Sequence, residues 1–307
     1  MTLETDLLLD RRRLKRRLLF WRSFAVLAVV AAVLAALRDE GVAFGRSHVA
    51  RLTVSGLITD DRKVSEAVAK LADDDSAKAL IVSINSPGGS VAGGEGLHDA
   101  ITHVAEKKPV VAVMGGTAAS AGYMIAVPAA RIFTREGTLT GSIGVLLETG
   151  EVSGLLKTLG VQAEAITSSP LKDQPSFIRP LTPEGRDVLH GLVMDMYDQF
   201  VGMVASGRHM DAARVRELAD GRAYTGRQAL QLGLVDAIGG EHDARVWLAE
   251  ANGVSADLPV EDVSTSGLAG RVLSSSLGWF VQSIWKAVFS QGVMLDGAWA
   301  VWQRSDG

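Results

Sequence analysis

The chain has 307 residues, of which 47% are hydrophobic and 33 are glycine, so it can form a large core and lacks the composition of a disordered protein. Its net charge of −4 gives no basis for nucleic-acid binding, and the lack of cysteine excludes disulfides, thiolate metal sites and a thiol nucleophile. The six histidines form neither an i, i+4 pair nor an H-E-x-x-H motif, so we expect no metal and no cofactor.

The N-terminus is the most basic part of the chain. Six of the seven residues 11–17 are Lys or Arg, and residues 18–37 are apolar except for Arg22 and Ser23. About 20 apolar residues suffice to cross a bilayer, and basic flanks stay cytoplasmic. We therefore predict a basic cytoplasmic segment at 1–17 and a transmembrane anchor at 18–37 that directs the rest of the chain outward. A cleaved signal peptide is the alternative.

Two strand–turn–helix units follow a first strand at 47–58 and a helix at 64–71. The first unit runs from a strand at 78–84, through a Gly-rich turn, into a helix at 92–105. The second runs from a strand at 108–113, through small residues, into an apolar helical run. In a parallel sheet, both turns should lie at the same edge.

Ser120 lies in the second turn, between strand and helix. A serine there projects its hydroxyl beside the Ala121 amide, which is unpaired at a helix N-terminus and can stabilise an oxyanion. The Gly88 and Gly89 amides in the first turn could supply a second donor. A packing turn or a phosphate-binding turn are the alternatives, although the run is not G-x-G-x-x-G and no lysine follows it.

The remaining elements continue the alternation of strands and helices. We expect strands at 130–134 and 161–166, a turn and strand at 138–145, a helix at 152–159, a loop with three prolines at 167–180, and a long helix that begins at Thr182-Pro183. This order is typical of an α/β fold with a mostly parallel sheet covered by helices.

A base for Ser120 is less evident, because no histidine lies between His103 and His190. Lys172 follows the last predicted strand in an otherwise uncharged stretch, and desolvation can keep a lysine neutral. Loop lysines are usually solvated, and Asp173 is adjacent. The residues alone therefore leave the identity of the base open.

Several blocks, in this order, resemble the bacterial signal peptide peptidase A family over residues 49–248: Asn85-Ser86-Pro87-Gly88-Gly89, Ala118-Ala119-Ser120-Ala121-Gly122-Tyr123, Thr140-Gly141-Ser142-Ile143-Gly144-Val145, Lys172-Asp173 and a later run at 220–236. The length is similar to the short form of the family. Leu171 stands where the family has Tyr, and Ala121 where it often has Gly; both departures could reshape the substrate groove.

The resemblance implies a Clp/crotonase-like fold with a peptidase domain at 47–250. It also implies a Ser/Lys dyad, in which Ser120 is the nucleophile, Lys172 the general base and Ser142 the residue that orients the lysine. The amides of Gly88 or Gly89 and of Ala121 would form the oxyanion hole.

The resemblance further implies a protease of the bacterial inner membrane, with its catalytic domain outward, that degrades remnant signal peptides after signal peptidase and assembles into a homo-oligomeric ring. A crotonase-type acyl-CoA enzyme, a non-catalytic scaffold and a protease for specific membrane proteins are the alternatives. Residues 251–307 form an apolar, Trp-rich extension that could lie in the membrane interface, dock on a groove or subunit, or complete the core.

Overall fold

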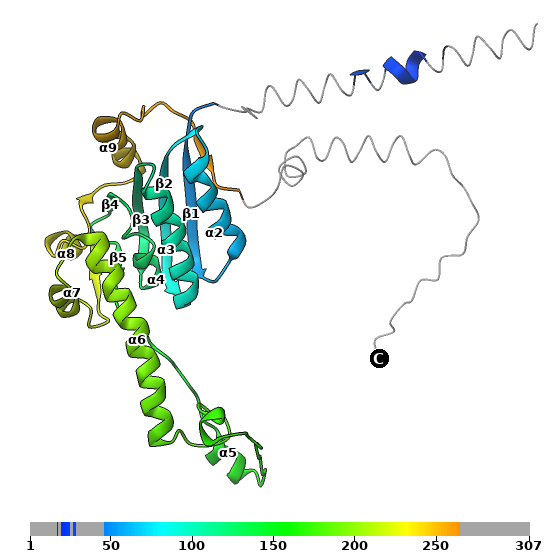
Figure 1. Ribbon diagram of the computed structural model, residues 1–307, viewed down its shortest axis with the longest axis vertical. Helices are drawn as coiled ribbons and strands as arrows, with labels where there is room; N and C mark the ends of the chain where they lie inside the picture. Colours follow the sequence, from blue (N-terminus) through cyan, green and yellow to red (C-terminus); the bar gives the residue numbers. More distant parts are fainter. Residues whose placement is uncertain (1–16, 18–19, 25–26, 29–45, 265–307) are drawn as a thin grey trace, which may run out of the picture. The chain divides into compact units, whose positions relative to one another are not determined.

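The computed structural model describes residues 17, 20–24, 27–28 and 46–264 (Figure 1). The predicted anchor at 18–37, all but one residue of the basic segment at 1–17, and the extension beyond residue 264 lie wholly or mostly outside the described residues. Within the described part, no helix has both the length and the apolar character that a membrane crossing needs. A compact unit spans residues 45–265.

An eight-stranded sheet forms the centre of this unit, in the order β6-β5-β3-β2-β1-β8, with β4 beside β3 and β7 beside β4. All pairs are parallel except β5 with β6, which confirms the mostly parallel sheet. The strands are β1 (His48–Ile58), β2 (Ala77–Gly89), β3 (Val110–Ala119), β4 (Arg131–Thr134), β5 (Leu139–Gly141), β6 (Ala223–Thr225), β7 (Ala237–Ile238) and β8 (Val260–Asp262).

Helices cover both faces of the sheet, as the near-continuous apolar strands require. Alternate residues of β2 separate into two cores: Leu80 and Val82 pack with α2, α3, α4 and α6, whereas Ala79 and Ile81 pack with α9. The α-helices are α2 (Arg62–Ala69), α3 (Val91–Ala105), α4 (Ala121–Met124), α5 (Ser153–Thr158), α6 (Pro183–Arg208), α7 (Ala212–Leu218), α8 (Gly226–Gln231) and α9 (Glu241–Asn252). The described residues also form the 3₁₀ helices η1 (Lys70–Asp73) and η2 (Pro170–Asp173).

Helix α6 links the sheet to a projecting segment (Figure 1). It begins as predicted, with the Thr182 hydroxyl accepting from the Gly185 amide. Phe200 and Val204 near its C-terminal end are buried, whereas Val188 and Leu192 near its start are exposed. We call residues 145–192 the arm.

The arm carries an unusual amount of exposed apolar surface. The exposed side chains are Leu146, Leu147, Val152, Leu155, Leu159, Val161, Ile166, Leu171, Phe177, Val188 and Leu192. The predicted helix at 152–159 is confirmed as α5. The predicted strand at 161–166 is wrong, because this exposed stretch has no strand beside it to complete its backbone hydrogen bonds.

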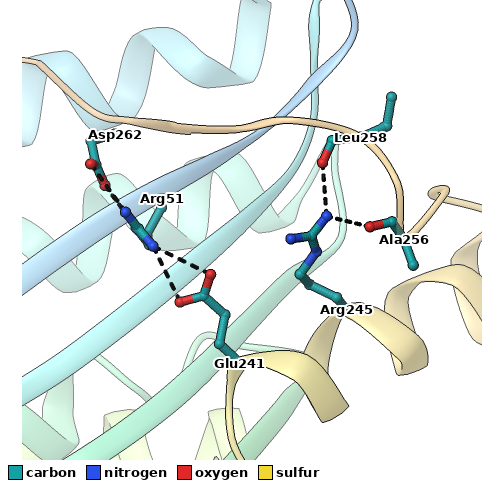
Figure 2. A network of polar contacts seen from close by, with 6 residues as sticks. All are labelled: Arg51, Glu241, Arg245, Ala256, Leu258 and Asp262. Carbon is teal, nitrogen blue, oxygen red and sulfur yellow. Dashed lines mark hydrogen bonds and ion pairs between the residues drawn. The ribbon is translucent and has the colours of Figure 1, made fainter.

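Strand β8 closes one edge of the sheet and extends the compact unit beyond the predicted boundary at residue 250. Arg51 of β1 holds it in place: its Nε donates to Asp262 Oδ1 at 2.7 Å, and its Nη1 donates to Glu241 at 3.3 Å (Figure 2). The hydrogen bond from Arg51 lowers the pKa of the Asp262 carboxyl. Arg245 of α9 also donates to the Leu258 carbonyl at 2.9 Å.

The ion pair between Arg208 and Asp236 is less exposed than those of Arg51 and leads to a stability prediction. The Arg208 side chain is only 9% exposed; its Nη1 donates to Asp236 Oδ2 at 3.0 Å and its Nε to the Gly233 carbonyl at 3.1 Å. The same Asp236 oxygen accepts from the Ile132 amide at 2.8 Å. Asp236→Ala should therefore lower the free energy of unfolding by about 3–5 kcal/mol, because it leaves a buried cation without its counterion.

Urea unfolding of the purified chain measures this effect. Glu66→Ala is the control, because it breaks an i, i+4 pair with Arg62 whose side chains are 50% and 88% exposed, and such pairs contribute about 0.5 kcal/mol or less. Equal unfolding midpoints for the two variants would show that the Arg208–Asp236 pair does not stabilise the fold.

Candidate active site

Ser120 occupies a strained turn between β3 and α4. Its φ of 54° and ψ of −123° lie outside the regions that residues with a side chain prefer, at a cost of about 1–3 kcal/mol. Backbone hydrogen bonds enforce the turn: the Ser120 amide donates to the Gly141 carbonyl at 2.9 Å, and the Ser120 carbonyl accepts from Tyr123 at 2.8 Å. Such strand-to-helix turns present a serine hydroxyl at the edge of a sheet.

Tyr123 secures the helix behind this turn. Its ring is fully buried and its hydroxyl donates to the Leu234 carbonyl at 2.7 Å. Burial raises the pKa of the Tyr123 hydroxyl, so that it remains a hydrogen-bond donor. The first residue of α4, Ala121, is thereby fixed next to Ser120, and its amide has no acceptor within the helix.

The two predicted turns do meet at one edge of the sheet. A Cβ atom added to Gly88 would lie 2.8 Å from Ser120 Cβ and 3.3 Å from Ser120 Oγ, so only glycine allows this approach. The φ of Gly88 is +119°, which also favours glycine.

The amides of the two glycines differ in their surroundings. Gly88 is buried and its amide donates to Ser86 Oγ at 3.1 Å. Gly89 is exposed and pairs with Ile58 of β1. Of the two amides singled out in the sequence, this arrangement favours Gly89 as an oxyanion donor, together with Ala121.

Ser142 lies at the same edge, directly after β5. Its neighbour Gly141 pairs with Ala119, and the Gly141 carbonyl accepts a hydrogen bond from the Ser120 amide. Ser142 has a φ of 48°, and its hydroxyl donates to the Gly221 carbonyl at 3.3 Å. The structure thus brings Ser120, Gly88, Gly89, Ala121 and Ser142 to one sheet edge.

Lys172 lies elsewhere in the chain, in η2 on the arm, where its side chain is exposed. Among the described residues, its amine has no hydrogen-bond or ion-pair partner. The adjacent Asp173 is paired with Arg179 and does not bind the lysine. No hydrogen bond joins Lys172 to Ser120 or Ser142 within the part of the chain that the structure describes.

Sequence reasoning assigned no role to two polar residues of the first turn. Asn85 Oδ1 accepts from the Thr117 amide at 3.2 Å, which joins the two turns. Ser86 is fully buried and binds Gly88. Their position in the Gly-rich block was the available signal, but a serine in such a block gives no hint of its partner.

The chain is similar to known proteases over most of the residues that the structure describes. Residues 102–255 match the profile of peptidase family S49, and residues 51–140 match that of Clp protease. A Synechocystis sp. protein provisionally named a protease is 42% identical over 213 residues, which make up 69% of this chain and 77% of that protein. An Enterococcus faecium protein provisionally named signal peptide peptidase SppA is 36% identical over 220 residues, which make up 67% of this chain and 63% of that protein. A solved structure of a mutant of a membrane-bound stomatin-specific protease has 18% identity and a TM-score of 0.48, and covers 72% of this chain and 99% of its own.

Proposed function

The chain belongs to peptidase family S49 and is a serine peptidase with a Clp-like α/β fold, and from this premise we propose that Ser120 and Lys172 form its catalytic dyad. The observation that carries the proposal is the strained turn at the end of β3, which holds Ser120 against Gly88. Backbone strain of this kind persists only where the surroundings enforce it, and it is frequent at active sites.

The proposed reaction is acyl transfer to Ser120. The neutral amine of Lys172 accepts the Ser120 proton while Oγ attacks the carbonyl carbon of a peptide bond. The amides of Gly89 and Ala121 stabilise the oxyanion, and the lysine ammonium then donates its proton to the leaving amine. Water hydrolyses the acyl-enzyme with the same lysine as base. Ser142 orients the amine.

A homo-oligomer in which the arm of one subunit reaches the next would bring these groups together. Lys172 is exposed on the arm, and its amine has no partner within the described residues. The exposed apolar side chains of the arm are typical of a surface that another chain covers. A head-to-tail contact gives a closed ring when the rotation between subunits closes, and in the ring that we propose each Ser120 meets the lysine of a neighbour.

We also propose that the protein is anchored in the bacterial inner membrane by residues 18–37, with its catalytic domain outward, and that it degrades hydrophobic peptides such as signal-peptide remnants. The basic segment followed by an apolar stretch supports the anchor and its orientation. The name of the Enterococcus faecium relative agrees with the substrate class.

Synthetic peptides test the proposed substrate class. The full-length chain in detergent should cleave a peptide with an uninterrupted apolar stretch faster than a peptide of the same length in which every second apolar residue is replaced by Asp. Equal kcat/KM for the two peptides would contradict the preference for signal-peptide remnants.

Carbonate washing of membranes should leave the full chain in the pellet, and its release would contradict the anchor.

A further inference from the structure

The hydroxyl of Ser86 forms hydrogen bonds with both the amide and the carbonyl of Gly88. Ser86 is 0% exposed; its Oγ accepts from the Gly88 amide at 3.1 Å and donates to the Gly88 carbonyl at 3.3 Å. A serine hydroxyl carries one donor and two acceptor sites, so it can make both bonds at once.

The bond to the Gly88 carbonyl has a consequence for the next amide. The Gly88 carbonyl and the Gly89 N–H belong to one planar trans peptide unit, in which they point in opposite directions. Fixing the carbonyl of Gly88 on Ser86 therefore also fixes the direction of the Gly89 N–H. Glycine has no side chain that would favour one orientation of this unit, so the orientation depends on its hydrogen bonds.

The position of this peptide unit relates it to the reacting serine. Gly88 lies against Ser120, and a Cβ on Gly88 would be 3.3 Å from Ser120 Oγ. On its other side, the Gly88–Gly89 segment pairs with Leu57 and Ile58 of β1. Strand β1 thus holds the segment from outside the site, and Ser86 holds it from within the fold.

We infer that Ser86 is a positioning residue of the peptidase: it orients the Gly88–Gly89 peptide so that the Gly89 amide faces the oxyanion that forms at Ser120. This inference rests on the proposed function of Ser120. Because Ser86 is fully buried, we place its action at Gly89 and not at the substrate. Its loss should weaken transition-state stabilisation and leave substrate binding largely unchanged.

A transition-state analogue separates this role from a merely structural one. A peptide aldehyde forms a hemiacetal with Ser120 whose oxyanion occupies the hole, whereas the corresponding peptide alcohol forms none. In Ser86→Ala, the Ki of the aldehyde should rise at least about tenfold, and kcat should fall by a similar factor, while KM and the Ki of the alcohol change less than about twofold. Thr140→Val is the matched control, because it removes another fully buried hydroxyl, bonded to the Ala118 carbonyl at 2.8 Å, without touching Gly88.

The two Ki values of Ser86→Ala decide the inference. A parallel change in both Ki values, or no change in either, overturns it. If Ser86→Ala does not fold, Ser86→Cys takes its place: the thiol bonds more weakly, so an intermediate loss in aldehyde affinity supports the inference and wild-type affinity overturns it.

Ser120→Ala, measured alongside, should neither cleave peptide nor prefer the aldehyde. Cleavage by that variant would refute the proposed function, an outcome distinct from any result with Ser86.

Discussion

Ser120→Ala should reduce peptide hydrolysis by the purified protein at least about 10³-fold, because removal of a nucleophile leaves only the oxyanion hole and substrate binding to act. Its kcat on a fluorogenic apolar peptide measures the loss. A fluorophosphonate probe, which reacts with activated serines, should label the wild-type chain at Ser120 and leave the variant unlabelled.

The strain at Ser120 supplies a control on the fold. Ser120 makes no side-chain hydrogen bond that caps α4, so its replacement removes no cap. Ser120→Gly should be equally inactive but more stable than Ser120→Ala by about 1 kcal/mol, because glycine adopts a φ of 54° without strain. Residual cleavage at the wild-type rate in either folded variant would rule out Ser120 as the nucleophile.

Lys172→Ala should abolish activity as completely as Ser120→Ala, because Ser120 would then lack a base. If the dyad forms between subunits, mixing the two inactive variants should restore activity. Each productive site then needs its serine from one variant and its lysine from the other, so random exchange gives about a quarter of the wild-type rate.

Lys157→Ala is the matched control for this experiment, since Lys157 is another exposed lysine of the arm, in α5. Lys157→Ala should retain wild-type activity. In an equal mixture with either inactive variant, it should give only the activity expected from the Lys157→Ala subunits themselves. Differently tagged variants that co-purify, and so exchange subunits, yet remain inactive would contradict a dyad shared between subunits.

The elements that the sequence predicted correctly are those defined by local patterns. Buried β-branched runs followed by Gly-rich turns identified β2 and β3, and Thr182-Pro183 marked the start of α6. Strand β8 has only three residues and depends on Arg51, which is 211 positions away from Asp262, so no local pattern could reveal it. The alternation of apolar and polar residues at 161–166 predicted a strand wrongly, because such a pattern does not show whether a neighbouring strand is present to pair with it.

The candidate site divides in the same way. The meeting of Ser120 with Gly88 follows from parallel topology, which places successive turns at one edge. The hydrogen bonds of Ser86 depend on a single φ of +119° at Gly88, which composition does not encode. Whether Lys172 reaches a serine depends on the direction of the arm and on the surface of another subunit that the arm contacts. The residues next to Lys172 predict neither of these.

The closure of the sheet by β8 also determines where the rest of the chain is attached. Val49 near the start of β1 lies beside Val260 of β8, so the polypeptide enters and leaves the folded unit at a single corner. Ser120 sits at the opposite end of β3, about 30 Å along the strand direction. Both ends of the folded unit therefore lie at the far edge of the sheet, which leaves the edge around Ser120 clear of the points where the chain enters and exits this unit.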